Sequence, residues 1–441
     1  NGKRRLKMKQ LTRLFIPICL ETLFYMLSGM VDTLMLSAVG DYAVGAVGTA
    51  NSYIGIFIIM FSIISSGMVS VMTQNIGAGR PGVAYQARQL GLLFNAVAGV
   101  LMAVFLFSGA GAILRMVGSA DALYEPALIY LKIVGGGCIL NAVIPIFSSY
   151  LRAFGYTKQP LYATLVGNIA TFVMNAVFLF VLHKGVAGVA TATVISKILN
   201  LCIVLYFSHK LISAKNSTER IANKTVLGQI VKVGLPSACE TALYNVAMML
   251  VIRFLNQMDA EGLNVTARSY TATISNFSYC VGAALAQANA IMTGWHIGAG
   301  ELEECDRGTK RAAFVGVCVA VCMETAIVLG SGFIMPLFTD NPEMTALVRK
   351  LLAIDIVLEI GRVTNLVFGQ ALKTSGDAVF PAVIAAVFMF VFAVGGTWLF
   401  GISMGLMAVG AYIGLASDEC VRAVGMVWRW KTGKWRTKKL V

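Results

Sequence analysis

Long apolar stretches recur from one end of the chain to the other, and they constrain its fold more than any other feature. A segment of about 20 apolar residues is long enough to cross a hydrocarbon core about 30 Å thick as an α-helix. Only helices and closed barrels satisfy their backbone groups in lipid, and the alternation typical of barrel strands is missing. We therefore predict an all-α membrane protein with twelve transmembrane helices. The apolar runs span residues 11–38, 44–76, 89–110, 123–147, 160–183, 186–208, 229–257, 264–297, 311–336, 343–372, 379–400 and 403–428.

The charge balance supports this class and indicates the topology. Hydrophobic residues make up 58% of the 441 residues and charged residues 13%, whereas roughly a quarter of the residues in soluble domains are charged. The net charge of +14 is concentrated in three basic clusters, within residues 3–13, 210–232 and 429–439. Twelve crossings place all three clusters on one side of the membrane, and the positive-inside rule assigns that side to the cytoplasm. We expect a multi-pass protein of the plasma (inner) membrane with both termini cytoplasmic.

The same clusters indicate the partners of the chain. Basic residues next to membrane spans contact anionic lipid headgroups, so the lipid bilayer is one expected partner. Nucleic acid is not expected, because no basic surface domain with interleaved aromatic residues is visible. We expect a monomer that binds a small-molecule substrate.

Several functional classes are argued against by missing motifs. The sequence has no Gly-rich loop ending in Gly-Lys-Ser/Thr, so an ion gradient rather than ATP is the expected energy source. Three histidines stand at the ends of predicted helices, and no nucleophile with a base or metal-ligand cluster is apparent. The nine cysteines are scattered singly, which favours packing over disulfides. We expect a protein that is not an enzyme and needs no cofactor other than a coupling ion, H⁺ or Na⁺.

Internal repetition divides the chain into two halves. Pro17, Glu21, Thr22 and Tyr25 recur as Pro236, Glu240, Thr241 and Tyr244, the turn "NIGAGR" (75–80) recurs as "HIGAGE" (296–301), and "LRAFGYTKQP" (from 151) resembles "LKTSGDAVFP" (from 372). Six predicted helices separate the equivalents, so the repeats run in the same direction, as in many transporters. We predict an N-terminal six-helix bundle at 1–208, a cytoplasmic linker at 209–226 and a C-terminal six-helix bundle at 227–441. Alternating exposure of a cavity between the bundles would move a substrate across the membrane.

Two acids interrupt the first apolar run. Glu21 lies roughly 15 Å along its helix from Leu11, near the bilayer midplane, and Asp32 follows eleven residues later on nearly the same face. An ionised side chain facing lipid costs several kcal/mol, so both acids are expected to face the protein interior or a wet cavity. Such a carboxyl group can exchange a proton for a drug cation or Na⁺. The alternative is a structural acid, neutral or bound to backbone and hydroxyl donors.

The second half carries more charge within its apolar runs. Glu240 is the repeat equivalent of Glu21, and Asp355, Glu359 and Arg362 share one face of their predicted helix. Asn276 belongs to a polar stretch of the run at 264–297, which we interpret as a wall of the cavity. Two interpretations of the charges stay open, an internal ion-pair network and an ion-coupling site. The last run adds Asp418, Glu419 and Arg422.

Several of these motifs, taken in order, carry a family resemblance. The run "VDTLMLSAVGDYAVGAVGTAN" (31–51), the two "IGAG" turns, "LRAFGYTKQP", "GVAGVATAT" (185–193) and "GLP" (234–236) together resemble the multidrug and toxic compound extrusion (MATE) family. The stretch "DIVLEIGRVTNLVFGQALKTSGDAVFP" (355–381) resembles a bacterial subgroup of it. The resemblance implies an antiporter that expels organic, often cationic and amphipathic, compounds in exchange for protons or sodium.

The resemblance also suggests individual residues. Asp32 stands at the position of the family's functional aspartate on the first helix, and the pocket around it would contain Thr171, Asn175 and Thr193, with Asn168 as a further polar candidate. A second acid of that pocket is missing, because Asn175 occupies its place. Helix-to-helix hydrogen bonding remains the alternative role of these amides and hydroxyls.

In the second half the carry-over is less direct. Related transporters use acids on helices 7 and 10 for the cation. Here Glu240 lies one turn before the helix 7 position, and Arg362 occupies the helix 10 position, which leaves Glu359 as the neighbouring substitute. A Na⁺ ion would bind at Asp32 or at Glu240.

Other functions remain open from the sequence. A flippase for lipid-linked saccharides has a related fold, although it would favour a basic cavity. An exporter of a specific anionic metabolite is kept open by Arg362 and Arg268. An ion channel or receptor without coupled transport is disfavoured by the duplicated bundle and its mid-membrane carboxylates.

Overall fold

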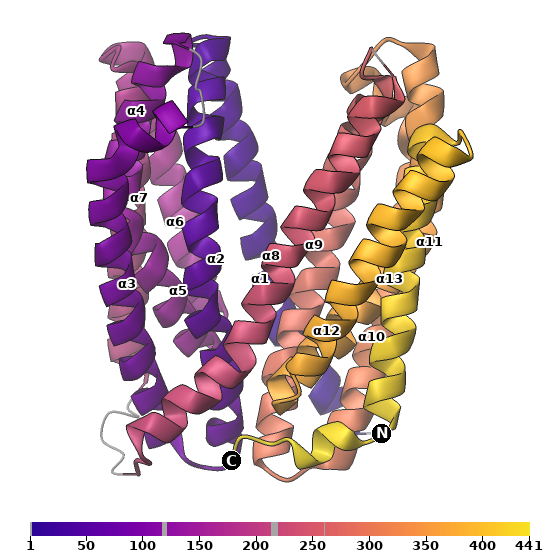
Figure 1. The fold of residues 1–441 in the computed structure, drawn as a ribbon. Coiled ribbons are helices and arrows are strands. Elements are labelled where there is room, and N and C mark those ends of the chain that lie inside the picture. Colours follow the sequence, from indigo (N-terminus) through magenta and orange to yellow (C-terminus); the bar gives the residue numbers. More distant parts are fainter. Residues whose placement is uncertain (1, 117–120, 213–218, 260) are drawn as a thin grey trace. The chain divides into compact units, whose positions relative to one another are not determined.

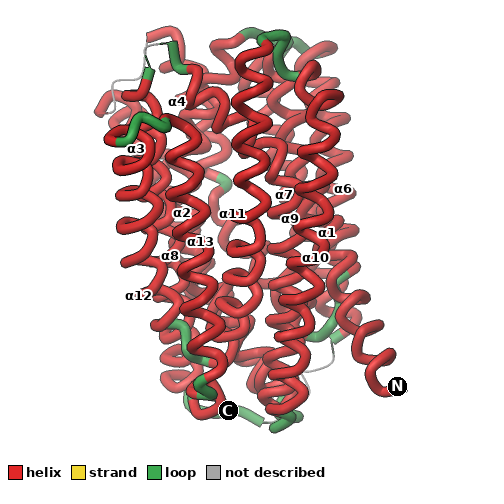
Figure 2. The backbone as a smooth tube through the Cα atoms, turned by 90° about the vertical axis from the view of Figure 1, so that its right-hand side faces the viewer, coloured by secondary structure: helices red, strands yellow, loops and turns green. Residues whose placement is uncertain are grey.

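All regular elements of the described chain are helices. The computed structural model describes residues 2–116, 121–212, 219–259 and 261–441, and strands are missing from these ranges (Figures 1 and 2). The elements are α1 (Gly2–Ser37), α2 (Asp41–Gly77), α3 (Pro81–Met116), α4 (Asp121–Gly136), α5 (Cys138–Ala153), α6 (Lys158–Ala176), η1 (Val177–Val181), α7 (Gly185–Leu211), α8 (Asn223–Met258), α9 (Leu263–Gly298), α10 (Leu302–Ile334), η3 (Met335–Leu337), α11 (Pro342–Ser375), α12 (Val379–Phe388), η4 (Met389–Val394), η5 (Thr397–Ser403), α13 (Met407–Lys431) and η6 (Lys434–Thr437).

Each predicted apolar run corresponds to a helical segment, so the all-α class is confirmed. The run at 123–147 is built from α4 and α5, which meet at Gly137 with a bend of 42°. The run at 379–400 combines α12 with the π-helical segments η4 and η5. By length and hydropathy alone, eight helices of the described ranges qualify as membrane spans, and the bent pair makes nine. The count of twelve is consistent with the structure, since three further long helices accompany these nine.

Those three helices are α9, α11 and α13. α11 and α13 each carry two acids and an arginine in their middle, and α9 is rich in hydroxyl and amide side chains. α11 packs against both α9 and α13. A helix that is too polar to face lipid is stable in a membrane when its polar groups turn towards neighbouring helices. The polar residues of the second half are therefore gathered where these three helices meet.

The chain forms two compact units, unit 1 (Asn1–Gly234) and unit 2 (Leu235–Val441). The division lies within α8, after the predicted linker at 209–226. The middle of that linker, residues 213–218, is outside the described part of the chain. Each unit has its own buried cluster of hydrophobic residues.

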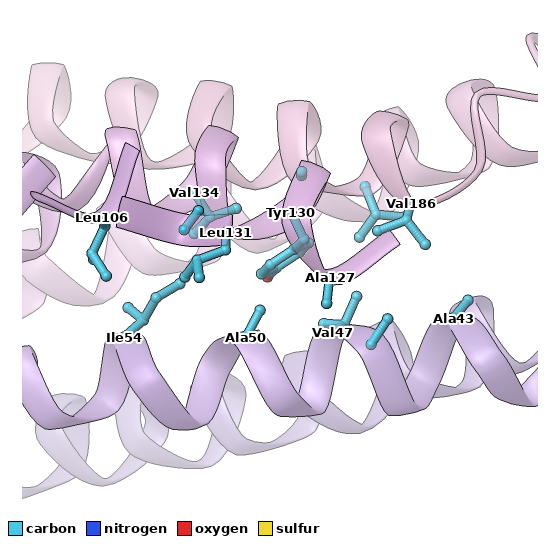
Figure 3. Packing of buried hydrophobic residues seen from close by; sticks show 14 of the residues in the cluster. Ala43, Val47, Ala50, Ile54, Leu106, Ala127, Tyr130, Leu131, Val134 and Val186 are labelled. Atoms are coloured by element: carbon cyan, nitrogen blue, oxygen red, sulfur yellow. The ribbon is translucent and has the colours of Figure 1, made fainter. Parts of the chain in front are cut away.

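Small residues let the helices of unit 1 approach closely. Ala43, Val47 and Ala50 form one stripe of α2, which faces Ala127 and Tyr130 of α4 (Figure 3). The three alanines are fully buried. Close van der Waals packing of this kind holds membrane helices together, because lipid is as apolar as the side chains themselves.

Glycines play the same part in unit 2. A Cβ added at Gly410 of α13 would lie 2.4 Å from the carbonyl carbon of Phe400, and one added at Gly414 would lie 2.9 Å from that of Gly396. Only glycine allows this approach of two backbones. The Gly-xxx-Gly spacing in α13 therefore seats this helix against η5.

The sequence repeat reappears in the backbone. Gly79 and Gly300, 221 residues apart, end their helices with φ of 75° and 76°. Gly155 and Gly376 form a second pair with the same spacing, at 86° and 97°. Left-handed residues after a helix end are commonly glycine, because a Cβ is disfavoured there. The repeated motifs thus mark repeated helix ends.

The connection before α9 is held by one acid. Asp259 accepts hydrogen bonds from the backbone amides of Leu263, at 2.8 Å, and Asn264, at 3.0 Å, and from the side chain of Asn264. Burial by itself would raise the pKa of Asp259, but the donors on Asn264 and Leu263 hold this pKa below its ordinary value of 3.8. The ionised carboxylate therefore stabilises the start of α9.

Candidate functional site

The first acid of α1 has a fixed partner. Arg152 of α5 places its Nη2 2.6 Å from Oε1 of Glu21, and Thr164 of α6 lies 3.4 Å from the same oxygen. Glu21 was predicted from the sequence as a coupling residue. The structure gives it an ion pair that joins α1 to α5 within unit 1.

The repeat preserves this ion pair. Nζ of Lys373 on α11 lies 2.7 Å from Oε2 of Glu240 on α8. Lys373 and Arg152 are equivalent positions of the repeated motif, as are Glu240 and Glu21. The recurrence of the acid in the sequence therefore corresponds to a recurring tie between two helices.

Asp32 differs from both of these acids. Asn175 of α6 donates a hydrogen bond of 3.0 Å from its Nδ2 to Oδ1 of Asp32. Among the residues that the structure describes, no base forms an ion pair with Asp32. The carboxylate is half-buried, so charge on it is compensated only by an amide and by whatever occupies the space beside it.

Asn175 suits both protonation states of this acid. Its side chain is fully buried, and its Oδ1 has no hydrogen-bond donor. An amide can donate to a carboxylate through its nitrogen and accept from a protonated carboxyl group through its oxygen. The second acid that the resemblance led us to look for is thus replaced by a neutral group that tolerates proton uptake and release at Asp32.

Two residues that were not predicted complete this set, Tyr130 of α4 and Asn51 of α2. The hydroxyl of Tyr130 is within hydrogen-bonding reach of Asn51 and Thr193, and Asp32 is among its electrostatic neighbours. Thr193 also bonds to the carbonyl of Val189 in its own helix. The polar character of Asn51, which closes the motif at 31–51, was the available signal.

Thr171 and Asn168 take other roles in α6. The hydroxyl of Thr171 bonds to the carbonyl of Gly167 at 3.0 Å, one turn earlier. Asn168 donates to the backbone carbonyl of Phe24 in α1, also at 3.0 Å. The first bond lies within one helix and the second joins two helices, and neither contacts Asp32.

A buried base of unit 1 was also missed. Nζ of Lys197 on α7 lies 2.7 Å from Oδ1 of Asn141 on α5. The partner is an amide rather than an acid. Asp418 stands at the equivalent position of the second repeat, so the two units place opposite charges at corresponding points.

Unit 2 contains a cavity of about 470 Å³ lined by α8, α9, α11 and α13. Glu240, Asn276, Asp355 and Arg362, all predicted site residues, line it together. Tyrosine and methionine side chains supply apolar wall, among them Tyr244 and Met248.

An ion-pair network forms one side of this cavity. Arg362 contacts Glu359 and lies 3.8 Å from Glu419, whose other oxygen accepts a hydrogen bond from Asn365 at 3.1 Å. Arg422 binds both Asp418 and Glu419 at 2.8 Å. The network interpretation of these charges therefore describes α11 and α13 well. Asp355 forms no salt bridge in the described ranges and stands beside the network.

One acid close to this network was missed altogether. Glu324 of α10 is fully buried, and the structure describes no hydrogen-bond partner for either of its carboxylate oxygens. Its signal in the sequence was a single acid in the apolar run at 311–336. Nothing in the sequence indicated what lies next to it.

Comparison with known proteins shows likeness over both units. The family model MatE matches residues 17–177 and 236–399. The chain is 32% identical over 428 residues to the uncharacterized transporter YisQ of Bacillus subtilis, covering 96% of this chain and 94% of that protein. It is 20% identical over 447 residues to the probable multidrug resistance protein NorM of Thermotoga maritima, covering 98% and 94%. Among solved structures, a mutant of the Vibrio cholerae MATE transporter VcmN matches with a TM-score of 0.86 at 17% identity, covering 97% of this chain and 98% of that chain.

Proposed function

Because the chain belongs to the MatE family of membrane transporters, we propose that it is a secondary active efflux transporter working by alternating access. It exchanges organic, cationic and amphipathic compounds for protons or sodium. The observation that carries this proposal is the environment of Asp32, a carboxyl group in a membrane helix whose described hydrogen-bond partner is an amide and which has no described base beside it.

The exchange follows from competition for one charge. An ionised carboxylate away from bulk water attracts a cationic group, and uptake of a proton removes that attraction. Asn175 binds Asp32 in either state, through its Nδ2 or its unpartnered Oδ1. Protonation from outside therefore releases the cargo, and loss of the proton inside prepares the site for the next one.

The test is transport by the purified protein in proteoliposomes. Proton and sodium gradients are imposed separately, and efflux of a cationic dye is followed with the wild type, Asp32→Asn and Glu21→Gln. We expect Asp32→Asn to abolish gradient-driven efflux. Glu21→Gln is the matched control, because it neutralises an acid of the same helix that already has Arg152 as a partner. Equal efflux by the wild type and Asp32→Asn would refute the proposal.

A second candidate function is export of an anionic metabolite, and Arg268 favours it. This arginine of α9 lines the cavity of unit 2, and its buried Nε has no acceptor in the structure. Its Nη2 contacts only the sulfur of Met248, at 3.7 Å, among the hydrogen bonds described. Guanidinium groups bind carboxylates and phosphates through paired hydrogen bonds. Transport of an anionic fluorophore that disappears in Arg268→Gln but persists in Asp32→Asn would support this candidate over the first.

A further inference from the structure

Three carboxyl groups of unit 2 converge on one point. Glu324 of α10 and both Asp355 and Glu359 of α11 each bring one oxygen to within 4.8 Å of the other two. The exposed fractions of these residues are 0%, 2% and 0%. They come from two helices that pack against each other, so the packing itself holds the three groups together.

The converging oxygens lack partners. Both oxygens of Glu324, Oδ2 of Asp355 and Oε2 of Glu359 have no hydrogen-bond donor in the structure. Arg362 contacts the other oxygen of Glu359, so one guanidinium faces three acids. Buried carboxylates at this separation cannot all stay ionised unless a positive charge lies among them.

The donor set suits a hard cation. Oxygen ligands lie about 2.3–2.6 Å from an ion of the size of Ca²⁺, so two ligands on opposite sides are about 5 Å apart. Na⁺ is of similar size. The observed separations fall within this limit. Hydroxyl groups of Ser275 and Ser278 on α9 face Asp355 and Glu324, without well-formed hydrogen bonds to them, and offer further oxygens.

The surroundings favour a monovalent over a divalent ion. Ca²⁺ takes six to eight oxygen ligands, whereas the four unpartnered carboxylate oxygens and two hydroxyls give at most six. Arg362 adds a fixed positive charge next to the site, which opposes a second charge on the ion. Asp355 lines the cavity of unit 2, whereas Glu324 and Glu359 do not. An ion therefore enters from the cavity past Asp355.

We propose that Glu324, Asp355 and Glu359 form a binding site for one sodium ion in unit 2, for which protons compete. This site differs from the cation position that the family resemblance suggests, because Arg362 occupies that helix 10 position and Glu324 comes from another helix. The proposal does not depend on the role of Asp32.

The experiment measures binding rather than transport. The purified full-length protein in detergent is titrated with ²²Na⁺ in a scintillation proximity assay, at constant ionic strength maintained with choline. We expect saturable binding by the wild type at pH 8, weaker binding at pH 6, and at least a tenfold weaker affinity in Glu324→Gln. Asp355→Asn, on the cavity side, is a second variant in case the first does not fold. Asp32→Asn is the matched control and retains binding.

Clear outcomes would overturn the proposal. They are the absence of saturable ²²Na⁺ binding by the wild type between pH 6 and 9, and wild-type affinity in both folded variants of unit 2. Loss of binding in Asp32→Asn with retention in Glu324→Gln would place the ion in unit 1 instead. Displacement of ²²Na⁺ by Ca²⁺ at lower concentration than by unlabelled Na⁺ would refute the monovalent assignment. None of these outcomes decides whether Asp32 drives efflux, so the two proposals fail independently.

Discussion

Gly361 of α11 controls how closely α13 approaches the charged network, and adding one methyl group there tests this packing. A Cβ at this position would lie 2.7 Å from the amide nitrogen of Cys420 and 2.8 Å from the carbonyl carbon of Glu419. Ordinary contacts of a Cβ begin at 3.4 Å, so α13 must retreat by about 0.7 Å, the difference between these distances. Backbone atoms cannot rotate aside as a side chain can. The helices themselves must therefore move.

The cost follows from this displacement. Overpacking of a well-packed interior costs about 1–3 kcal/mol, and replacing a helical glycine by alanine returns about 0.5–1 kcal/mol. Gly361→Ala is therefore expected to lower the free energy of unfolding by about 1–2 kcal/mol. Gly308→Ala in α10 is the matched control, because nothing lies within 4 Å of its added Cβ. The control should raise the free energy of unfolding by up to about 1 kcal/mol.

The two variants are compared by unfolding in mixed micelles with increasing sodium dodecyl sulfate. Tryptophan fluorescence reports the transition, since Trp430 and Trp435 are buried in unit 2 with their rings stacked at 4.2 Å. The expected result is a pair of shifts with opposite signs. Gly361→Ala with wild-type stability, or both variants shifted in the same direction, would refute the close approach of α11 and α13.

Three further predictions concern other parts of the chain. Arg152→Met should lower the free energy of unfolding by about 3 kcal/mol because it leaves the charge of Glu21 uncompensated, and the double variant with Glu21→Gln should recover most of this loss in the same titration; strictly additive effects would contradict the pairing. Asp259→Asn should destabilise the protein at neutral pH. Because the folded-state pKa of Asp259 lies below the unfolded value of 3.8, this contribution is present above pH 3.8 and is lost as the pH falls through the folded-state pKa, so the two stability curves should converge in acid; curves that stay parallel would speak against it. Trp435→Ala should cost about 3 kcal/mol or more, since it removes a buried ring from its stack on Trp430, and an unchanged unfolding midpoint would show that the C-terminal turn does not contribute to stability.

Much of the fold could be predicted from the sequence because the membrane imposes a simple rule on it. A backbone in lipid must satisfy its own hydrogen bonds, so each long apolar run becomes a helix whatever its neighbours are. The repeated motifs correctly indicated repeated helix ends, as Gly155 and Gly376 illustrate. The family inferred from the motifs is confirmed by the family model that matches both units.

The site was only partly predictable, and the reason is the partner of each charge. The sequence located Glu21, Asp32 and Glu240 equally well within apolar runs, but it did not distinguish acids with a base beside them from the one without. Arg152 is 131 residues away from Glu21 in the sequence and lies on another helix. Local spacing carries no information about such a contact.

Apolar patterning along the chain by itself determined that this protein is helical, membrane-spanning and duplicated, because these properties depend on runs of residues read one after another. Tertiary structure alone decided which charges are compensated. The electrostatic state of a buried group depends on the nearest few ångströms of space, and helix packing fills that space with residues from distant parts of the chain. For that reason Glu21 and Glu240 are tied to bases, Asp32 meets an amide, and Glu324 comes to lie beside Asp355 and Glu359.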